Sequence, residues 1–388
     1  MADEFNLHSI YEQNLSFLFG AGASNGFLPT LALQIKDDQG KKCTFETLAK
    51  RFEHNDNMRT LLFMLYYREC INLGLPTGNN VTPRPPNQFM VIKEYKRFLS
   101  TLVEVLEKQG TSAKKANIYT TNYDSCFEIA SDELLREQST QFAVNDGSAG
   151  FQTRTFHTKN FNQRVVHKGI FDRHDQYLPQ LNLLHAHGSV YWEKGRDNGE
   201  IKLNYGCSNY RIAFGPVETE LLDAFNVLLN DEKKITEDLV AFEQEHNFAP
   251  LQINDFWSQY EEIPIVNPTK RKFHETVFEE AYYQILRHLS YELERPNSVL
   301  ITFGFSFADE HILNLIQRSL SNPSLTVYIS CFNDGELAWM TEAFKGYKNV
   351  KFIHSDENLD LDFTHFNDKK FTLAKGKGSK NVDNGVNQ

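Results

Sequence analysis

The sequence lacks closely spaced cysteines. Its five cysteines are odd in number and far apart, and no two of them form a C-x-x-C pair. A disulfide framework uses an even set of cysteines and a zinc ribbon uses closely spaced ones, so we expect neither. We therefore predict a protein without a bound metal. The cysteines are Cys43, Cys70, Cys126, Cys207 and Cys331.

Long apolar runs and a signal peptide are also missing. Residues 1–14 carry Asp3, Glu4 and Glu12 and contain no basic segment followed by an apolar stretch, as a signal peptide would. No apolar run approaches the roughly 20 residues of a membrane-spanning helix. We expect a cytoplasmic protein that makes no contact with a membrane.

Positive charge is scarce. The chain has 40 lysines and arginines against 51 aspartates and glutamates, which gives a formal net charge of −11. Proteins that bind DNA through its phosphates depend on clustered cations, so strong direct binding of nucleic acid is not expected. Aromatic residues are abundant instead, with 31 Phe and 16 Tyr among 388 residues. The length allows one large domain with insertions, or about two or three domains, around an aromatic core.

The first local motif is a short apolar segment that ends in glycines. Leu15 to Phe19 is mostly apolar, and the sequence GAGAS follows from Gly20 to Ser24. This pattern predicts a buried strand and then a tight turn whose backbone can approach a phosphate closely. The alternative is a glycine turn without a special role, because the spacing of the glycines departs from G-x-G-x-x-G.

Two later apolar segments end in polar residues. The sequence TTNYD places Asn122 and Asp124 where a strand meets a helix, and ligands of open α/β sheets bind at such junctions. The alternative is that these two side chains only cap the helix. The sequence HAHGS ends another strand with His185 and His187, which are either hydrogen-bonded structural residues or proton acceptors. Zinc binding would require further ligands that do not accompany these histidines.

A fourth strand-like segment, residues 298–303, leads through GFSFAD to a helix that is capped near Asp309. Another strand and helix follow it. Recurring strand and helix units predict an α/β fold with a Rossmann-like, doubly wound parallel sheet. Helical spacing predicts a helical insertion over 44–110, and the acidic, aromatic stretch 195–262 predicts a second, irregular insertion.

These units divide the chain into three parts of a Rossmann-like core, two insertions and a disordered tail. The core parts are residues 1–43, 111–194 and 263–371. The insertions are residues 44–110 and 195–262, and the tail is 372–388.

Taken together, GAGAS, TTNYD, HAHGS and GFSFAD resemble the sirtuin motifs G-A-G-x-S, T-Q-N-x-D, H-G and G-T-S in order and approximate spacing. The resemblance extends from Gly20 to Asp309, and it implies that the chain binds NAD. By this resemblance Asn122 and His187 are the catalytic residues. The residues implied to bind NAD are Gly20, Ala21, Gly22, Ser24, Asp124, Gly304, Ser306 and Asn333.

Departures from the sirtuin pattern bear on which reaction the chain catalyses. Deacylating sirtuins carry a zinc module with two C-x-x-C pairs, which this sequence lacks, and the segment Pro264 to Glu275 instead resembles the bacterial defence branch of the family. Sirtuin-like domains of that branch deplete NAD to halt infected cells, so the resemblance implies an NAD glycohydrolase that acts in abortive infection. An NAD-dependent protein deacylase and a catalytically silent module that senses NAD or ADP-ribose remain the alternatives.

Partners are implied by the same resemblance. Stand-alone subunits of this kind associate with HerA-type hexameric ATPases, so we expect a homo-oligomer that works with such an ATPase or helicase. Residues 231–262 contain nine acidic residues and two lysines. This stretch is either a solvated helix face or a docking surface for a basic partner.

Overall fold

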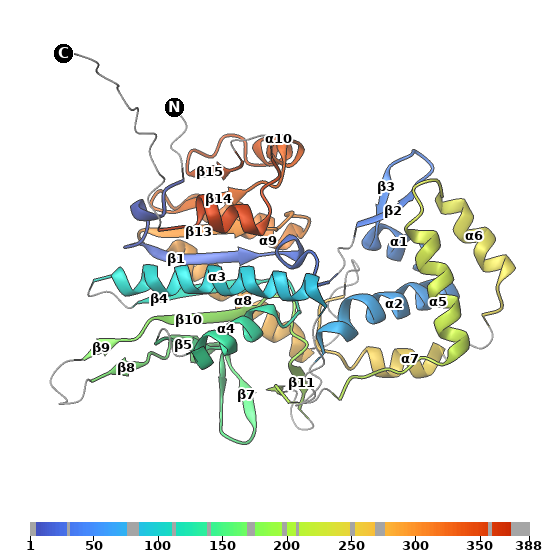
Figure 1. Ribbon diagram of the computed structural model, residues 1–388, viewed down its shortest axis with the longest axis horizontal. Coiled ribbons are helices and arrows are strands. Elements are labelled where there is room, and N and C mark those ends of the chain that lie inside the picture. The colour runs from blue at the N-terminus through green and yellow to red at the C-terminus, as the bar shows by residue number, and fades with distance from the viewer. Residues whose placement is uncertain are drawn as a thin grey trace, which may run out of the picture.

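The computed structural model describes most of the chain in two units, one built on a sheet and one built of helices (Figure 1). The helical unit lies beside one end of the sheet-based unit. The predicted tail lies outside the described residues from residue 374 onward. The described residues are 5–28, 32–75, 85–110, 114–137, 141–168, 175–195, 200–206, 209–248, 253–267, 276–355 and 359–373.

A seven-stranded parallel sheet forms the centre of the larger unit. In spatial order its strands are β15 (Val350–Ile353), β14 (Thr326–Ser330), β13 (Ser298–Phe303), β1 (Asn14–Phe19), β4 (Lys115–Thr120), β10 (Gln180–His185) and β5 (Ala143–Asn145). The chain first extends the sheet on the β4 side of β1 and later on the β13 side. The sheet is therefore doubly wound, and its winding reverses between β1 and β13. The predicted α/β, Rossmann-like class is confirmed.

Alternate side chains of the central strand face two different layers of helices. Phe17 and Phe19 of β1 pack in one hydrophobic core and Leu18 packs in another, as the two-residue period of a strand requires. Helices α3 (Pro86–Lys108), α4 (Cys126–Glu137) and α11 (Phe363–His365) cover the first face. Helices α8 (Thr276–Glu294), α9 (Glu310–Ser319) and α10 (Asp334–Ala343) cover the second.

The phenylalanine-rich composition is concentrated in the first of these layers. The ring of Phe19 lies 4.9 Å from that of Phe98 and 5.0 Å from that of Phe127, both in edge-to-face arrangements. Such pairs contribute about 0.5–1.5 kcal/mol each beyond the burial of their area. The aromatic core expected from the composition thus holds α3 and α4 against the centre of the sheet.

The helical unit combines two stretches that are far apart in the sequence, and one hydrophobic core joins them. The first stretch contains β2 (Ala32–Lys36), β3 (Lys42–Thr44), α1 (Phe45–Arg51), α2 (Asp56–Tyr66) and the turns Tyr67–Ile71 and Asn72–Gly74. The second contains α5 (Pro216–Leu229), α6 (Thr236–Glu245) and α7 (Ile253–Tyr260). The second predicted insertion therefore contributes three regular helices joined by irregular segments.

The structure divides the predicted helical insertion 44–110 between the two units. Its first half, up to residue 74, belongs to the helical unit. Its second half is α3, whose residues Phe98, Leu102 and Leu106 pack in the core of the sheet. Parallel neighbours such as β1 and β4 need a crossover connection, and α3 is the helix that completes it.

Short antiparallel strands complete the sheet-based unit. Strands β11 (Trp192–Lys194), β12 (Ile201–Leu203), β7 (Arg154–Phe156) and β6 (Ser148–Ala149) form one small sheet, and β8 (Val166–His167) pairs with β9 (Gln176–Tyr177). The remaining 3-10 turns are η1 (Leu7–Ser9), η2 (Ala21–Ser24) and η5 (Thr158–Asn162). Within the described ranges, no helix is long and apolar enough to cross a membrane.

Candidate active site

The four motifs meet at one edge of the sheet. Each of them directly follows one of the adjacent strands β13, β1, β4 and β10, which run parallel. Because the carboxyl ends of parallel strands lie together, residues that are far apart in the sequence become neighbours there. The winding of the sheet also reverses between β1 and β13, where open α/β sheets bind their ligands.

The glycines of the first and fourth motifs are in close contact. The backbone N–H of Gly20 donates to the carbonyl of Phe303 at 3.1 Å, and that of Gly22 donates to the carbonyl of Gly304 at 2.9 Å. A Cβ atom on Gly304 would lie 2.4 Å from the backbone nitrogen of Ala23, and Gly304 has a φ of 61°. Both the space and the dihedral angle therefore require glycine at position 304.

A buried hydrogen-bond network surrounds the hydroxyl group of Ser24. This hydroxyl donates to Asp124 Oδ2 at 2.6 Å, and it accepts from Asn122 Nδ2 at 3.0 Å. The hydroxyl of Tyr95 lies 2.8 Å away and supplies the other donor, since the single proton of Ser24 is already engaged. The side chains of Ser24, Asn122 and Asp124 are all buried. Burial, together with the charge of Asp124, holds the pKa of Tyr95 well above its ordinary value.

The two proposed capping residues differ in what they do. Asp124 Oδ1 accepts from the backbone N–H of Cys126 at 3.0 Å, at the start of α4, so Asp124 does act as a helix cap. Asn122 does not, because its amide donates to the carbonyl of Gly20 and to Ser24. The capping interpretation is therefore correct for Asp124 and wrong for Asn122.

His185 is enclosed by two acceptors. Its Nδ1 lies 3.1 Å from the carbonyl oxygen of Asn122, and its Nε2 lies 2.8 Å from Glu128 Oε1. Burial lowers the pKa of His185, but the attraction and hydrogen bond of Glu128 outweigh it, and the pKa is above its ordinary value. Both ring nitrogens face groups that accept hydrogen bonds, which favours the doubly protonated ring, and such a ring has no lone pair with which to accept a proton from a ligand.

His187 has a different environment, although it lies only two residues further along. Its Nε2 lies 3.0 Å from Asp309 Oδ2, and its side chain is 15% exposed. The other oxygen of Asp309 caps α9 by accepting from the backbone N–H groups of His311 and Ile312. Because the carboxylate of Asp309 accepts the hydrogen bond of Nε2–H, a neutral ring in this position carries its lone pair on Nδ1. Nδ1 makes no hydrogen bond to any residue that the structure describes.

The remaining motif residues lie at the same edge but outside the buried network. Ala21, Gly22 and Ser306 are exposed. Asn333 is also exposed, and its side chain caps α10 by accepting from the backbone N–H of Glu336 at 3.0 Å. The structure thus brings Gly20, Ser24, Asn122 and Asp124 into hydrogen-bonded contact, whereas Ser306 and Asn333 make no hydrogen bond with that network.

Sequence reasoning missed three residues of the site. Asp309 was identified only as a helix cap, Glu128 was not singled out, and Tyr95 lies in the helical pattern of α3. Glu128 follows the TTNYD motif by one turn of α4, which is a signal that could have drawn attention to it. Nothing local distinguishes Tyr95 from the other apolar residues of α3, because the distance between Tyr95 and Ser24 is set by the tertiary fold.

The site contains carboxylates and imidazoles, which are side chains that can bind metal ions. No group of three or more His, Cys, Asp or Glu residues within the described ranges is arranged to hold a metal ion. Cys43, Cys70, Cys126 and Cys331 are buried and lie in three different hydrophobic cores. No protein-family model matches the chain, and no curated protein matches it either.

Proposed function

We propose that the chain is a sirtuin-like NAD glycohydrolase that cleaves the nicotinamide–ribose bond of NAD to give ADP-ribose and nicotinamide. The observation that carries this proposal is the pairing of His187 with Asp309 at the carboxyl edge of the sheet, beside the glycine loops. The pair provides an oriented proton acceptor at the edge where ligands of such sheets bind. The motif order, which resembles that of sirtuins, supplies the choice of NAD.

The reaction needs a proton acceptor but no acid. The ring nitrogen of nicotinamide is cationic in NAD, so nicotinamide leaves as a neutral molecule when the bond breaks. Water then adds to the ribose carbon, and its proton passes to Nδ1 of His187 and on to solvent. A neutral imidazole is suited to this step near pH 7.

The groups beside His187 stabilise the positive charge that develops on the ribose. The leaving bond creates a positive ribose centre, and oriented carboxylates and dipoles stabilise such a centre without the cost of reorganising solvent. Asn122 donates from its amide nitrogen within the protein, so its Oδ1 is the atom left to accept a hydrogen bond from a ribose hydroxyl or the water. Asp124 holds this arrangement through Ser24.

The test is incubation of the purified protein with NAD, followed by chromatographic separation of nicotinamide, ADP-ribose and cyclic ADP-ribose. We expect nicotinamide and ADP-ribose from the wild type and from His54→Ala, an exposed control in the helical unit. Asn122→Ala should remove the activity and remain folded. An acetylated peptide in the same assay distinguishes the deacylase, and binding without turnover distinguishes the silent sensor.

The biological setting we propose is NAD depletion during abortive infection, within a homo-oligomer and with a HerA-type hexameric ATPase as partner. The support for this setting is the resemblance to the defence branch of the family. The assay above should therefore be run with and without the ATPase. An increase in nicotinamide release on addition of the ATPase would support the partnership, and equal rates would argue against activation by it.

A further inference from the structure

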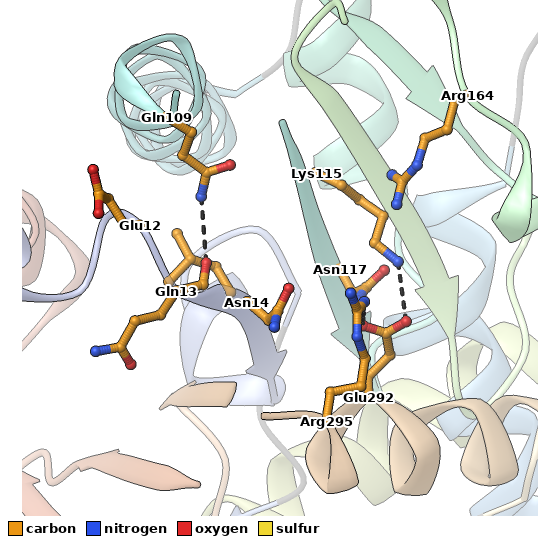
Figure 2. A pocket seen from close by; sticks show the side chains of 10 residues that line it. Glu12, Gln13, Asn14, Gln109, Lys115, Asn117, Arg164, Glu292 and Arg295 are labelled. Carbon is orange, nitrogen blue, oxygen red and sulfur yellow. Dashed lines mark hydrogen bonds and ion pairs between the residues drawn. The ribbon is translucent and has the colours of Figure 1, made fainter. Parts of the chain in front are cut away.

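A polar cavity lies at the opposite, amino edge of the sheet (Figure 2). It has a volume of about 70 Å³ and lies between the starts of β1 and β4 and the end of α8. The NAD site we propose is at the carboxyl ends of the same strands, so the two sites are separated by the length of the sheet.

Cations predominate in the cavity. Lys115 Nζ lies 3.0 Å from Glu292 Oε1, and Arg295 Nη1 lies 2.9 Å from Glu292 Oε2, so one carboxylate serves two cations. The other acidic residue of the lining, Glu12, is exposed, and its carboxylate points away from this cluster in Figure 2. Burial lowers the pKa of Lys115 even though Glu292 attracts the charged form.

The third cation, Arg164, has no such partner. Its guanidinium points toward Lys115 in Figure 2, and it makes no ion pair or hydrogen bond with any residue that the structure describes. Its Nη1 atom is buried. An unsatisfied buried donor is destabilising, and more so when it is charged, so this guanidinium favours an anionic acceptor within the cavity.

We propose that the cavity binds inorganic phosphate, held by the guanidinium of Arg164 and the ammonium group of Lys115. The three cations exceed Glu292 by two charges, and phosphate groups carry about two negative charges near neutral pH. The cavity volume of about 70 Å³ is sufficient for a five-atom oxyanion. Asn117 also lines the cavity; its Oδ1 accepts from Asn182, which leaves its amide N–H group for the anion.

The experiment measures phosphate binding by calorimetry and by the ³¹P line width, with chloride at the same ionic strength as the reference. Wild type is compared with Arg164→Gln and with Arg287→Gln, a control that removes an arginine on the outer side of α8, whose guanidinium contacts Tyr291. We expect Arg164→Gln to weaken binding by about tenfold or more, since the guanidinium contact is charge-assisted and bidentate. Arg287→Gln should bind like the wild type.

Equal phosphate affinity in wild type and Arg164→Gln would overturn the proposal, because the phosphate would then bind elsewhere, for example at the glycine loops. Absence of binding to the wild type would overturn it as well. If Arg164→Gln does not fold, Arg164→Lys decides, because it keeps the charge but loses the forked geometry. We expect Arg164→Lys to bind phosphate several-fold more weakly than the wild type, and an unchanged affinity would contradict the role of the guanidinium.

Discussion

Two histidines at the carboxyl edge of the sheet, His185 and His187, have similar partners but different environments. On one side, His185 bonds with Glu128 and with the carbonyl of Asn122, next to the buried network of Ser24. On the other side, His187 bonds with Asp309 through one nitrogen only. Each histidine has a carboxylate partner, but only His187 has a ring nitrogen, Nδ1, that makes no hydrogen bond to a described residue.

Two histidines near the end of one strand thus have different roles in our proposal, one structural and one chemical. His185 is the last residue of β10 and meets Glu128 of α4, whereas His187 lies beyond the strand and meets Asp309 at the start of α9, and these two helices cover opposite faces of the sheet. What distinguishes them is the number of acceptors that the fold places around each ring. The side containing His185 fixes the positions of the strand ends, and the side containing His187 carries the reactive group that we propose.

The largest effect is expected from Gly304→Ala, which breaks the contact that places Asp309 near His187. The new Cβ would lie 2.4 Å from the Ala23 nitrogen, at a φ of 61°. We expect a loss of about 4 kcal/mol or more in the free energy of unfolding, measured by urea denaturation. Gly40→Ala is the matched control, because Gly40 has a φ of 79° with no atom within 4 Å of the new Cβ. It should lose only about 1–2 kcal/mol, the cost of the left-handed conformation.

The second effect tests the side of the site that contains His185. His185→Ala leaves the carboxylate of Glu128 buried without its cation, so the loss of stability should be about 3 kcal/mol rather than the roughly 1 kcal/mol of one hydrogen bond. The double variant with Glu128→Gln should recover part of this loss, because no buried charge remains. Thermal or urea melting measures both, and a loss no greater than that of a surface histidine such as His54 would contradict this role.

The pH dependence of the same pair has a definite sign. The pKa of His185 is raised in the folded protein, so the ion pair stabilises the fold fully below the ordinary value of 6.5. This contribution is lost as the pH rises through the raised pKa. The difference in stability between the wild type and His185→Ala should therefore be larger at pH 6 than at pH 9, and a constant difference would mean that His185 is neutral in the folded state.

The third effect tests the side of the site that contains His187. His187→Ala should lower NAD turnover by about a hundredfold or more, the usual scale for loss of a general base, while the melting temperature changes little. Nicotinamide release and thermal melting are the two measurements. If His185→Ala is instead the folded and inactive variant and His187→Ala remains active, the assignment of the proton acceptor is wrong.

The smallest effect isolates the orienting role of Asp309. Asn is a good helix cap, so Asp309→Asn should leave α9 and the overall stability nearly unchanged. It removes the charge that orients His187, and we expect turnover to fall by about tenfold. Asp309→Ala removes the cap as well and should lose about 1 kcal/mol of stability in addition. Equal activity of Asp309→Asn and wild type would show that the pairing does not contribute to catalysis.

The parallel sheet could be predicted because its strands are short, apolar and followed by glycine or polar residues. The same pattern placed Gly20, Asn122, His187 and Gly304 at one edge, since strand ends are visible in the sequence. The division of 44–110 could not be predicted, because helical spacing is the same whether a helix packs on a sheet or on other helices. The choice between His185 and His187 depends on Glu128 and Asp309.

Pairs of residues that are far apart in the sequence, such as each histidine and its carboxylate, produce no local sequence pattern. His187 and Asp309 are separated by more than a hundred residues, and Arg164, between η5 and β8, lines the same cavity as Lys115 of β4 only in the folded chain. A sequence pattern records which face of an element is apolar. It does not record which charged side chain of another element lies across from that face, so the pairing of His187 with Asp309 and the polar cavity beside Arg164 became visible only in the folded structure.

The position of β1 affects how the protein is made. This strand leaves the ribosome well before β13, and its register pairs Phe19 with Thr120 on one side and with Phe303 on the other. At synthesis rates of about 10 residues per second, β1 waits on the order of half a minute for β13. During that interval one edge of an apolar strand is open to pairing with other chains, so nascent chains stalled before β13 should depend on chaperones to stay unaggregated.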